Sequence, residues 1–348
     1  MYSIIIIAML LTLLSIFSPT SKVYFFLNML VLTLVTGGYN GNVDLNFYIE
    51  QYNNESFKDF PFEGLYTLVS FFFHKSGIDF QTYHFILSAA AMLIIAFVIK
   101  ETTEEAAFVS ALLYGFSTVE YAPQIKTLLA SSVLIYALYI RLYKERTIKN
   151  TIKYLMLVLI ASGFHVLSVF FLIFLLDEKI QPKHAIISAI ATSAIIMVGR
   201  TLFFGKLLEY VPSFAFYFGR YRKNKVIIGM ILWQITGILI ANLLKKSICR
   251  ENENYEDIVN RIYKYSLLFI FISPLYLLTT VANRFIRIWS PYYYIEASYS
   301  ETLPFRVNYL RALMMLYSWG SFVLFYLILG QEQKIFLEII SNNIFFKI

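Results

Sequence analysis

The sequence has few charged residues and almost no cysteine. Only 15% of its residues are Asp, Glu, Lys or Arg, and Cys249 is its single cysteine. One cysteine excludes a disulfide within the chain. Because Lys245, Lys246 and Arg250 flank Cys249, we expect it in a reducing cytoplasmic loop, as an inert thiol.

Several catalytic motifs are also missing from the sequence. It contains no P-loop, no Gly-x-Gly-x-x-Gly, no His-Glu-x-x-His, no Gly-x-Ser-x-Gly and no Asp-x-Asp of the kind that holds a metal-bound nucleotide sugar. These absences count against ATP hydrolysis, metalloproteolysis and nucleotide-sugar chemistry, so we expect neither a metal nor a cofactor. Charges within the apolar segments are too few to suggest an ion-coupled carrier.

Apolar residues are abundant instead. Of 348 residues 59% are hydrophobic, including 33 Phe and 27 Tyr, and the mean hydropathy is +0.65. A spanning helix needs about 20 apolar residues, or somewhat fewer in a thin bilayer. We therefore predict an all-α polytopic integral membrane protein, a single transmembrane domain over 1–348 with about 10–13 transmembrane helices, some short or re-entrant. The apolar runs are 2–17, 23–35, 83–99, 106–118, 128–142, 154–176, 185–198, 226–244, 262–281, 285–297 and 307–329, with a weaker one at 62–73.

Charged residues between the runs predict the orientation. The segment 141–153 is basic and belongs on the cytoplasmic side, where Lys and Arg are enriched. The segment 38–63 is acidic, with Lys58 as its only basic residue. We expect 38–82 to form an extracytoplasmic loop with a short amphipathic or re-entrant helix. The net charge of +7 is explained by cytoplasmic loops and anionic membrane lipids, so no nucleic acid partner is expected.

The later part of the chain does not alternate simply. The segment 245–261 is rich in Lys and Arg, which favours the inside, whereas alternation from Arg141 places it outside. Either 202–219 makes an irregular extra crossing, or 154–176 is a re-entrant pair of half-helices. Both solutions place a basic loop, 200–225, outside, where an anionic ligand would explain it. The alternative is a cytoplasmic loop that obeys the charge rule. The basic residues clustered near the end of the loop are Arg220, Arg222, Lys223 and Lys225.

Asp44 is the first candidate for chemistry. It follows a glycine- and asparagine-rich turn directly after the second apolar run. A helix starting at Asp44 would place Tyr48 and Tyr52 on the same face, four residues apart. Asp44 would then be either a functional carboxylate or the cap of that helix.

Lys126 is the second candidate. It lies in Glu120-Tyr121-Ala122-Pro123-Gln124-Ile125-Lys126, where Pro123 breaks a helix between two apolar runs. A lysine at the start of a span is either an interfacial anchor or a cation in a cavity. We expect its partner to be Glu120 or a ligand phosphate.

His165 is the third candidate, near the middle of the run 154–176 with Gly163 close by. An ionisable side chain there indicates function by default, although serine or backbone partners would also satisfy a structural histidine. Any re-entrant hinge would lie near these two residues.

Arg284 and Arg287 together form the fourth candidate for chemistry. Three residues apart on a helix, they would present two guanidinium groups together, which suits a phosphate or diphosphate. The aromatic residues that follow, from Trp289 to Tyr294, suit either an interfacial belt or the stacking of sugar rings.

The order of these landmarks resembles the EpsG branch of Wzy-type bacterial polysaccharide polymerases. The resemblance runs over 38–297: an outer loop with Asp44 and spaced tyrosines, Gln-Ile-Lys-Thr-Leu-Leu-Ala at 124–130, a basic inner loop, Ala-Ser-Gly-Phe-His at 161–165 and a late Arg284. Two features depart from the family. Lys126-Thr127 replaces a frequent Arg-Gln, and no arginine shortly precedes Asp44, so phosphate binding is expected to shift toward Arg284, Arg287 or the basic loop 200–225.

The resemblance implies a GT-C-like glycosyltransferase in the bacterial cytoplasmic membrane, with its active site facing outward. It would join undecaprenyl diphosphate-linked oligosaccharides, alongside a chain-length regulator and a flippase. Asp44 or His165 would be the base, and Lys126, Gln124, Tyr48, Arg284, Arg287, Arg220 and Arg222 would bind substrate. The alternatives are a lipid-linked glycan ligase of similar architecture and a glycolipid flippase or transporter. A membrane acyltransferase, which would also use a histidine, lacks a supporting polar cluster.

Overall fold

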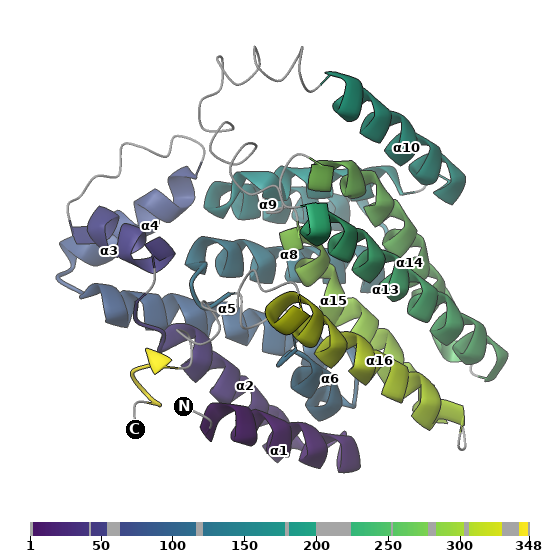
Figure 1. Cartoon of the computed structure of the whole chain (residues 1–348), viewed down its shortest axis with the longest axis horizontal. Coiled ribbons are helices and arrows are strands. Elements are labelled where there is room, and N and C mark those ends of the chain that lie inside the picture. The colour runs from purple at the N-terminus through teal and green to yellow at the C-terminus, as the bar shows by residue number, and fades with distance from the viewer. Residues whose placement is uncertain are drawn as a thin grey trace. The chain divides into compact units, whose positions relative to one another are not determined.

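The computed structural model describes residues 3–41, 43–53, 63–115, 121–177, 181–199, 224–251, 253–277, 283–302, 306–328 and 341–346. Within these ranges the regular elements are helices, and one isolated antiparallel bridge joins Tyr39 to Asn343 (Figure 1). The all-helical prediction is confirmed for this part of the chain. Glu120, Arg220 and Arg222, for which the sequence makes predictions, lie outside the described residues.

The chain divides into two compact units, Met1–Leu172 with Ser318–Ile348, and Ile173–Tyr317. The first holds α1 (Ser3–Phe17), α2 (Lys22–Gly37), α3 (Val43–Asn53), α4 (Gly64–Lys75), α5 (Phe80–Thr102), α6 (Ala106–Leu112), α8 (Ile125–Tyr143), α9 (Ile148–Phe164) and the π-helix η7 (Val323–Ile328). The second holds α10 (Pro182–Gly199), α13 (Asn224–Glu251), η3 (Glu253–Tyr255), α14 (Glu256–Leu268), η4 (Phe269–Leu277), α15 (Asn283–Ser298) and η6 (Tyr299–Thr302). The unit boundaries fall within η2 (Val166–Leu176) and α16 (Arg306–Phe322).

Each predicted apolar run overlaps at least one helix of the described residues, and the composition of these helices fits a membrane protein. By length and hydropathy, three of the described helices are able to cross a bilayer: α5, α8 and the part Lys225–Arg250 of α13. Shorter apolar helices include α1, α2 and η2. Large apolar side chains such as Leu93, Phe97 and Leu239 are exposed, which suits contact with lipid.

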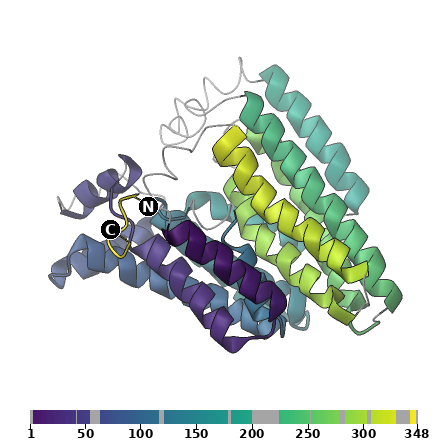
Figure 2. The ribbon, with the colours of Figure 1, turned by 60° about the horizontal axis from the view of Figure 1, so that its bottom comes forward.

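The first unit is built around α8, which is almost wholly buried and packs against α5 and α9. A second group, α1, α2 and α6, packs together, and Figure 2 shows α1 and α2 side by side. Asn28 of α2 links this group, since its Nδ2 lies 3.0 Å from Ser15 Oγ, 3.1 Å from the Ala107 carbonyl and 3.0 Å from Ser110 Oγ. Such amide contacts stabilise helix packing where water is absent.

Local signals define where these helices begin. The side chains of Ser21, Asp79 and Thr147 accept hydrogen bonds from the backbone at Tyr24, Thr82 and Asn150, and so cap α2, α5 and α9. The run 106–118 is helical only to Leu112, and a turn follows it. At Gly115 a Cβ atom would lie 2.2 Å from Ser318 Oγ, so only glycine permits this close approach.

The C-terminal segment 341–346 packs at the end of α2. The backbone N–H of Asn40 donates to the Asn342 carbonyl at 2.9 Å, and that of Ile344 donates to Gly38 at 2.8 Å. The amide of Asn343 donates to the carbonyl of Leu34 at 3.0 Å. This segment therefore lies at the same end of the first unit as the start of the loop 38–82.

In the second unit, α13 packs against α14 and α15 (Figure 1). The aromatic residues that follow Arg287 form its core, because Trp289, Tyr292, Tyr293 and Tyr294 are all buried. Trp289 stacks on Phe174 and Tyr292, and its Nε1 donates to Ser266 Oγ at 3.0 Å. These rings are packed against protein and do not form an exposed belt.

Candidate functional site

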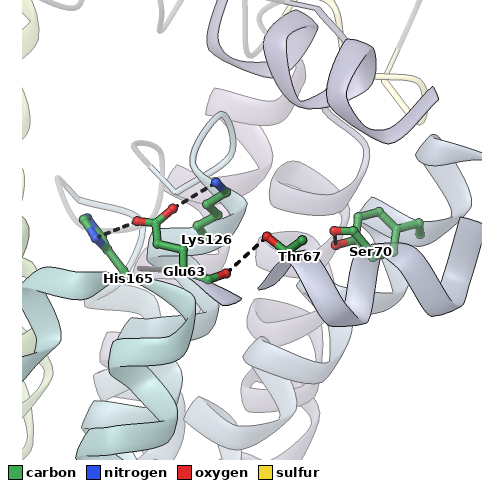
Figure 3. A network of polar contacts seen from close by, with 6 residues as sticks. Glu63, Thr67, Ser70, Lys126 and His165 are labelled. Atoms are coloured by element: carbon green, nitrogen blue, oxygen red, sulfur yellow. Dashed lines mark hydrogen bonds and ion pairs between the residues drawn. The ribbon is translucent and has the colours of Figure 1, made fainter. Parts of the chain in front are cut away.

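Three ionisable side chains meet inside the first unit. Glu63 lies between the other two: its Oε2 is 2.9 Å from Lys126 Nζ, and its Oε1 is 3.4 Å from His165 Nδ1 (Figure 3). Each of the three residues is only 4% exposed. Two of them, Lys126 and His165, are residues that the sequence singled out, and Glu63 joins them.

The ends of three helices place these side chains. Glu63 is the N-cap of α4, Lys126 lies in the first turn of α8, and His165 is the C-cap of α9. His165 has an extended backbone, with φ −149° and ψ 113°, so α9 ends at the histidine before η2 begins. The carbonyl of Glu63 accepts hydrogen bonds from the backbone and hydroxyl of Thr67, which anchors the start of α4.

Gly163 allows α4 and α9 to approach. A Cβ atom at this position would lie 2.8 Å from the Cβ of Leu65, closer than carbon atoms pack. Leu65 is two residues after Glu63 and Gly163 is two before His165. The close packing of these helix ends therefore brings the carboxylate to the imidazole.

Tyrosine rings enclose the ammonium of Lys126. Its Nζ lies 4.7 Å from the centre of the Tyr66 ring and 5.2 Å from that of Tyr48, distances suited to cation–π attraction. The two rings contact each other edge to face. Aromatic contacts continue from Tyr66 to Tyr83, whose hydroxyl is 2.6 Å from Ser70 Oγ.

The carboxyl of Glu63 is held in its charged form. Burial raises its pKa, but the hydrogen bond to His165 and the positive charge of Lys126 outweigh burial and lower the pKa to about 2. Nδ1 is the imidazole nitrogen of His165 that faces this carboxylate, at 3.4 Å.

Three other predicted site residues lie near this cluster. Gln124 is the N-cap residue of α8, two residues before Lys126, and its buried Oε1 has no hydrogen-bond partner among the described residues. Tyr48 contacts Lys126 directly. The backbone of Asp44 lies in α3 one helical turn before Tyr48, while its side chain falls outside the described part of the structure.

The two predicted arginines belong to the second unit. Arg284 and Arg287 both lie in the first turns of α15, with Arg284 partly buried and Arg287 only 1% exposed. They share one helix as the spacing predicts. Arg284 and Arg287 therefore belong to a different compact unit from Glu63, Lys126 and His165.

Sequence reasoning missed the role of Glu63. In the sequence Glu63 is only one of several acidic residues in the segment 38–63. The available signal was its position, since it directly precedes the apolar residues of α4, where an unpaired carboxylate is costly. Its partners are 63 and 102 residues further along the chain, so the pairing depends on tertiary structure.

A family model, that of the EpsG family, matches residues 22–338, nearly the whole chain. The chain belongs to the EpsG family. No curated protein and no solved structure matches it. The family match agrees with the resemblance noted in the sequence and supports a polymerase of polysaccharide biosynthesis. In this EpsG-family chain, no group of three or more His, Cys, Asp or Glu among the described residues is arranged to hold a metal ion.

Proposed function

We propose that this EpsG-family protein is a multi-pass glycosyltransferase of the bacterial cytoplasmic membrane, with a GT-C-like architecture. It joins oligosaccharide repeat units, each linked to a polyprenyl diphosphate such as undecaprenyl diphosphate, on the outer face of the membrane. A flippase would supply the units and a chain-length regulator would act on the product. The observation that carries the proposal is the buried cluster of Glu63, Lys126 and His165.

The position of this cluster supports an outward-facing site. Lys126 begins α8, whereas Arg141 and the basic segment 141–153 lie at and beyond the other end. The two residues are separated by roughly 23 Å along the axis at 1.5 Å per residue, most of the thickness of a bilayer core. If the basic segment is cytoplasmic, as the charge rule predicts, the cluster lies near the outer surface.

The chemistry requires a base and a cation. The hydroxyl of the acceptor unit attacks the anomeric carbon of the donor, and the bond from that carbon to the diphosphate oxygen breaks. The bonding electron pair leaves with the diphosphate, and the hydroxyl proton passes to the base. Such a donor is already activated, so cations that stabilise the departing diphosphate are sufficient.

His165 suits the base. Glu63 faces Nδ1 at 3.4 Å and would orient the imidazole, so that Nε2 could take the proton of the acceptor hydroxyl. A general base of this kind contributes about a hundred- to ten-thousand-fold in rate. Asp44 remains the second candidate, one turn from Tyr48 in α3.

Lys126 suits the diphosphate. In this structure its ammonium is paired with Glu63, so an incoming diphosphate would compete with that carboxylate for it. Gln124 and Tyr48 would contribute beside Lys126. Arg284, Arg287, Arg220 and Arg222 are proposed as further diphosphate-binding residues, as the resemblance to the family implies.

The test is the length distribution of lipid-linked glycan in cells that lack this gene and carry a variant. We expect single repeat units to accumulate with no gene, with His165→Gln and with Lys126→Met. Full-length polymer should return with the wild type, with Lys126→Arg, which keeps the charge, and with His184→Gln, an exposed histidine of α10. Asp44→Asn and Arg284→Ala should also stop chain growth without loss of protein from the membrane.

Other outcomes would redirect the proposal. Unchanged polymer length in a variant removes that residue from the mechanism. Normal polymer that stays on its lipid in cells without the gene would indicate a ligase. Units trapped on the inner face would indicate a transporter.

A further inference from the structure

The first unit contains a pocket that shares no residue with the cluster of Glu63, Lys126 and His165. It has a volume of about 460 Å³, within the range of small-molecule sites. Residues of α3, of the turn between α4 and α5, and of the start of α5 line it. The lining includes Asn40, Tyr52, Asn53, Asp79, Phe80 and Gln81.

The lining suits a sugar ring. Three amides and one carboxylate offer donors and acceptors for neighbouring hydroxyl groups, and the half-buried side chains of Ile49 and Ile78 offer apolar surface for the C–H faces of a sugar. The buried rings of Tyr52 and Phe80 form the base beneath them. Asn40, Asn53 and Asp79 are exposed, so their polar groups are accessible.

The charge of the pocket distinguishes it from a diphosphate site. Among the described residues no lysine or arginine lines it, and its ionisable lining residues are Asp79 and His74. Hydrogen bonds from Thr82 lower the pKa of the Asp79 carboxyl, which is therefore ionised. A negative charge in the wall disfavours phosphate and leaves a neutral or amino sugar as the ligand class.

The polar groups are held in place before any ligand binds. Asp79 Oδ1 accepts from the backbone N–H of Thr82 at 3.0 Å and Oδ2 from its hydroxyl at 2.6 Å. Gln81 Nε2 donates to the Gly37 carbonyl at 2.9 Å, which leaves its amide oxygen as an acceptor. Tyr52 donates to the Ile78 carbonyl at 2.8 Å. Side chains fixed in this way lose little entropy on binding.

Aromatic contacts connect the pocket to Lys126. Tyr52 stacks on Tyr83, with ring centres 4.8 Å apart, and Tyr83 contacts Tyr66 at 6.4 Å. Tyr66 in turn lies 4.7 Å from Lys126 Nζ. The wall of the pocket and the wall of the charged cluster are thus parts of one aromatic layer.

We propose that this pocket is a subsite for neutral glycan, which holds a sugar of the repeat unit or of the growing chain while the cationic groups bind the diphosphate. The assignment rests on the proposed function above. It predicts that sugar binding and diphosphate binding are separable.

Binding by the purified full-length protein tests the pocket without requiring catalysis. The probes are maltotetraose, cellotetraose, N-acetylglucosamine tetramer and short oligosaccharides cut by mild acid from the polysaccharide of the same cells, with inorganic pyrophosphate as competitor. Saturation-transfer NMR measures the binding of each oligosaccharide to the protein, with and without pyrophosphate. The variant is Asn53→Trp, which fills the pocket, and the matched control is Asn46→Trp, an exposed asparagine of the same helix that does not line it.

We expect at least one oligosaccharide to bind the wild type and Asn46→Trp, with affinity at least tenfold weaker for Asn53→Trp, and pyrophosphate not to displace it. The proposal is overturned if no oligosaccharide binds the wild type, if the two tryptophan variants bind alike, or if pyrophosphate competes.

Chain length in cells separates this proposal from the proposed function. If the wild type restores polymer but the binding result is negative, only the subsite fails. If the wild type restores no polymer, the proposed function fails and the binding result still decides the pocket. Single units accumulated with Asn53→Trp would assign the pocket to the incoming unit, and shortened chains would assign it to the growing chain.

Discussion

At the scale of single residues, Glu63 links the pH of the medium to the stability of the protein. Its pKa is about 2 in the folded protein, against an ordinary value of 4.5. Since folding favours the ionised form, Glu63 contributes stability that is complete above pH 4.5 and is lost as the pH falls toward 2.

We therefore expect Glu63→Gln to melt at a lower temperature than the wild type at neutral pH, with a gap that narrows between pH 4.5 and 2. Thermal unfolding of the detergent-solubilised proteins across this range measures it. Glu50→Gln, which changes an exposed residue of α3, should stay close to the wild type throughout. A gap for Glu63→Gln that does not depend on pH would contradict the ion-pair explanation.

The residues of the candidate site were only partly predictable from the sequence. Lys126 and His165 stand out because an ionisable side chain in an apolar run needs a reason. Glu63 does not stand out in an acidic loop, and the structure alone shows that it pairs with both. Glu120, the partner suggested for Lys126 by sequence proximity, lies outside the described residues.

At the scale of elements, the packing of α4 against α9 depends on Gly163. We expect Gly163→Ala to destabilise the protein by about 1–3 kcal/mol, because the new Cβ would lie 2.8 Å from Leu65 Cβ and the helices must separate. Activity should fall as well, since His165 would move away from Glu63. Melting temperature and polymer length in the same variant measure the two effects.

Gly320→Ala provides the matched control. This glycine lies in α16, and apart from its own helix backbone no described atom lies within 4 Å of an added Cβ. Alanine should be neutral there, or stabilise the helix by up to about 1 kcal/mol. Equal melting temperatures for the two alanine variants would show that the close approach at Gly163 does not matter.

Sequence predicts helix positions better than helix ends. Apolar runs of 15 to 19 residues locate α5, α8 and α13, because the thickness of a bilayer sets the length of a spanning helix. The run 154–176 was one uninterrupted apolar segment, yet it contains α9, a break at His165 and the 3₁₀ helix η2. Apolar composition does not distinguish these states. A hinge near Gly163 and His165 belongs to one of the two topologies that the sequence allows. The helix α9 ends at this point, before η2 begins.

At the scale of the whole molecule, the predicted orientation is testable with cysteine labelling. Because Cys249 is the only cysteine, Cys249→Ser provides a background in which one new thiol reports its own position. We expect Asn46→Cys to react with a membrane-impermeant maleimide in intact protoplasts, and Glu145→Cys to react only after permeabilisation. Both positions are exposed. The reverse pattern would place the cluster of Glu63, Lys126 and His165 on the cytoplasmic side.

Composition determines the class of the molecule, and the family match gives its general role. The charge pattern leaves two topologies for 154–225, because basic residues at 220–225 and at 245–261 make conflicting demands on the number of crossings. Counting of spans alone does not decide between them.

The segment 341–346, hydrogen-bonded to residues 38–41, has a practical consequence. If the loop 38–82 is extracytoplasmic, as the charge pattern predicts, a reporter joined after Phe346 starts on the outer side as well. A fluorescent reporter that matures only in the cytoplasm would then stay dark, whereas a phosphatase that requires export would be active. A bulky reporter at this position would also crowd Asn40, which lines the pocket proposed to hold a sugar.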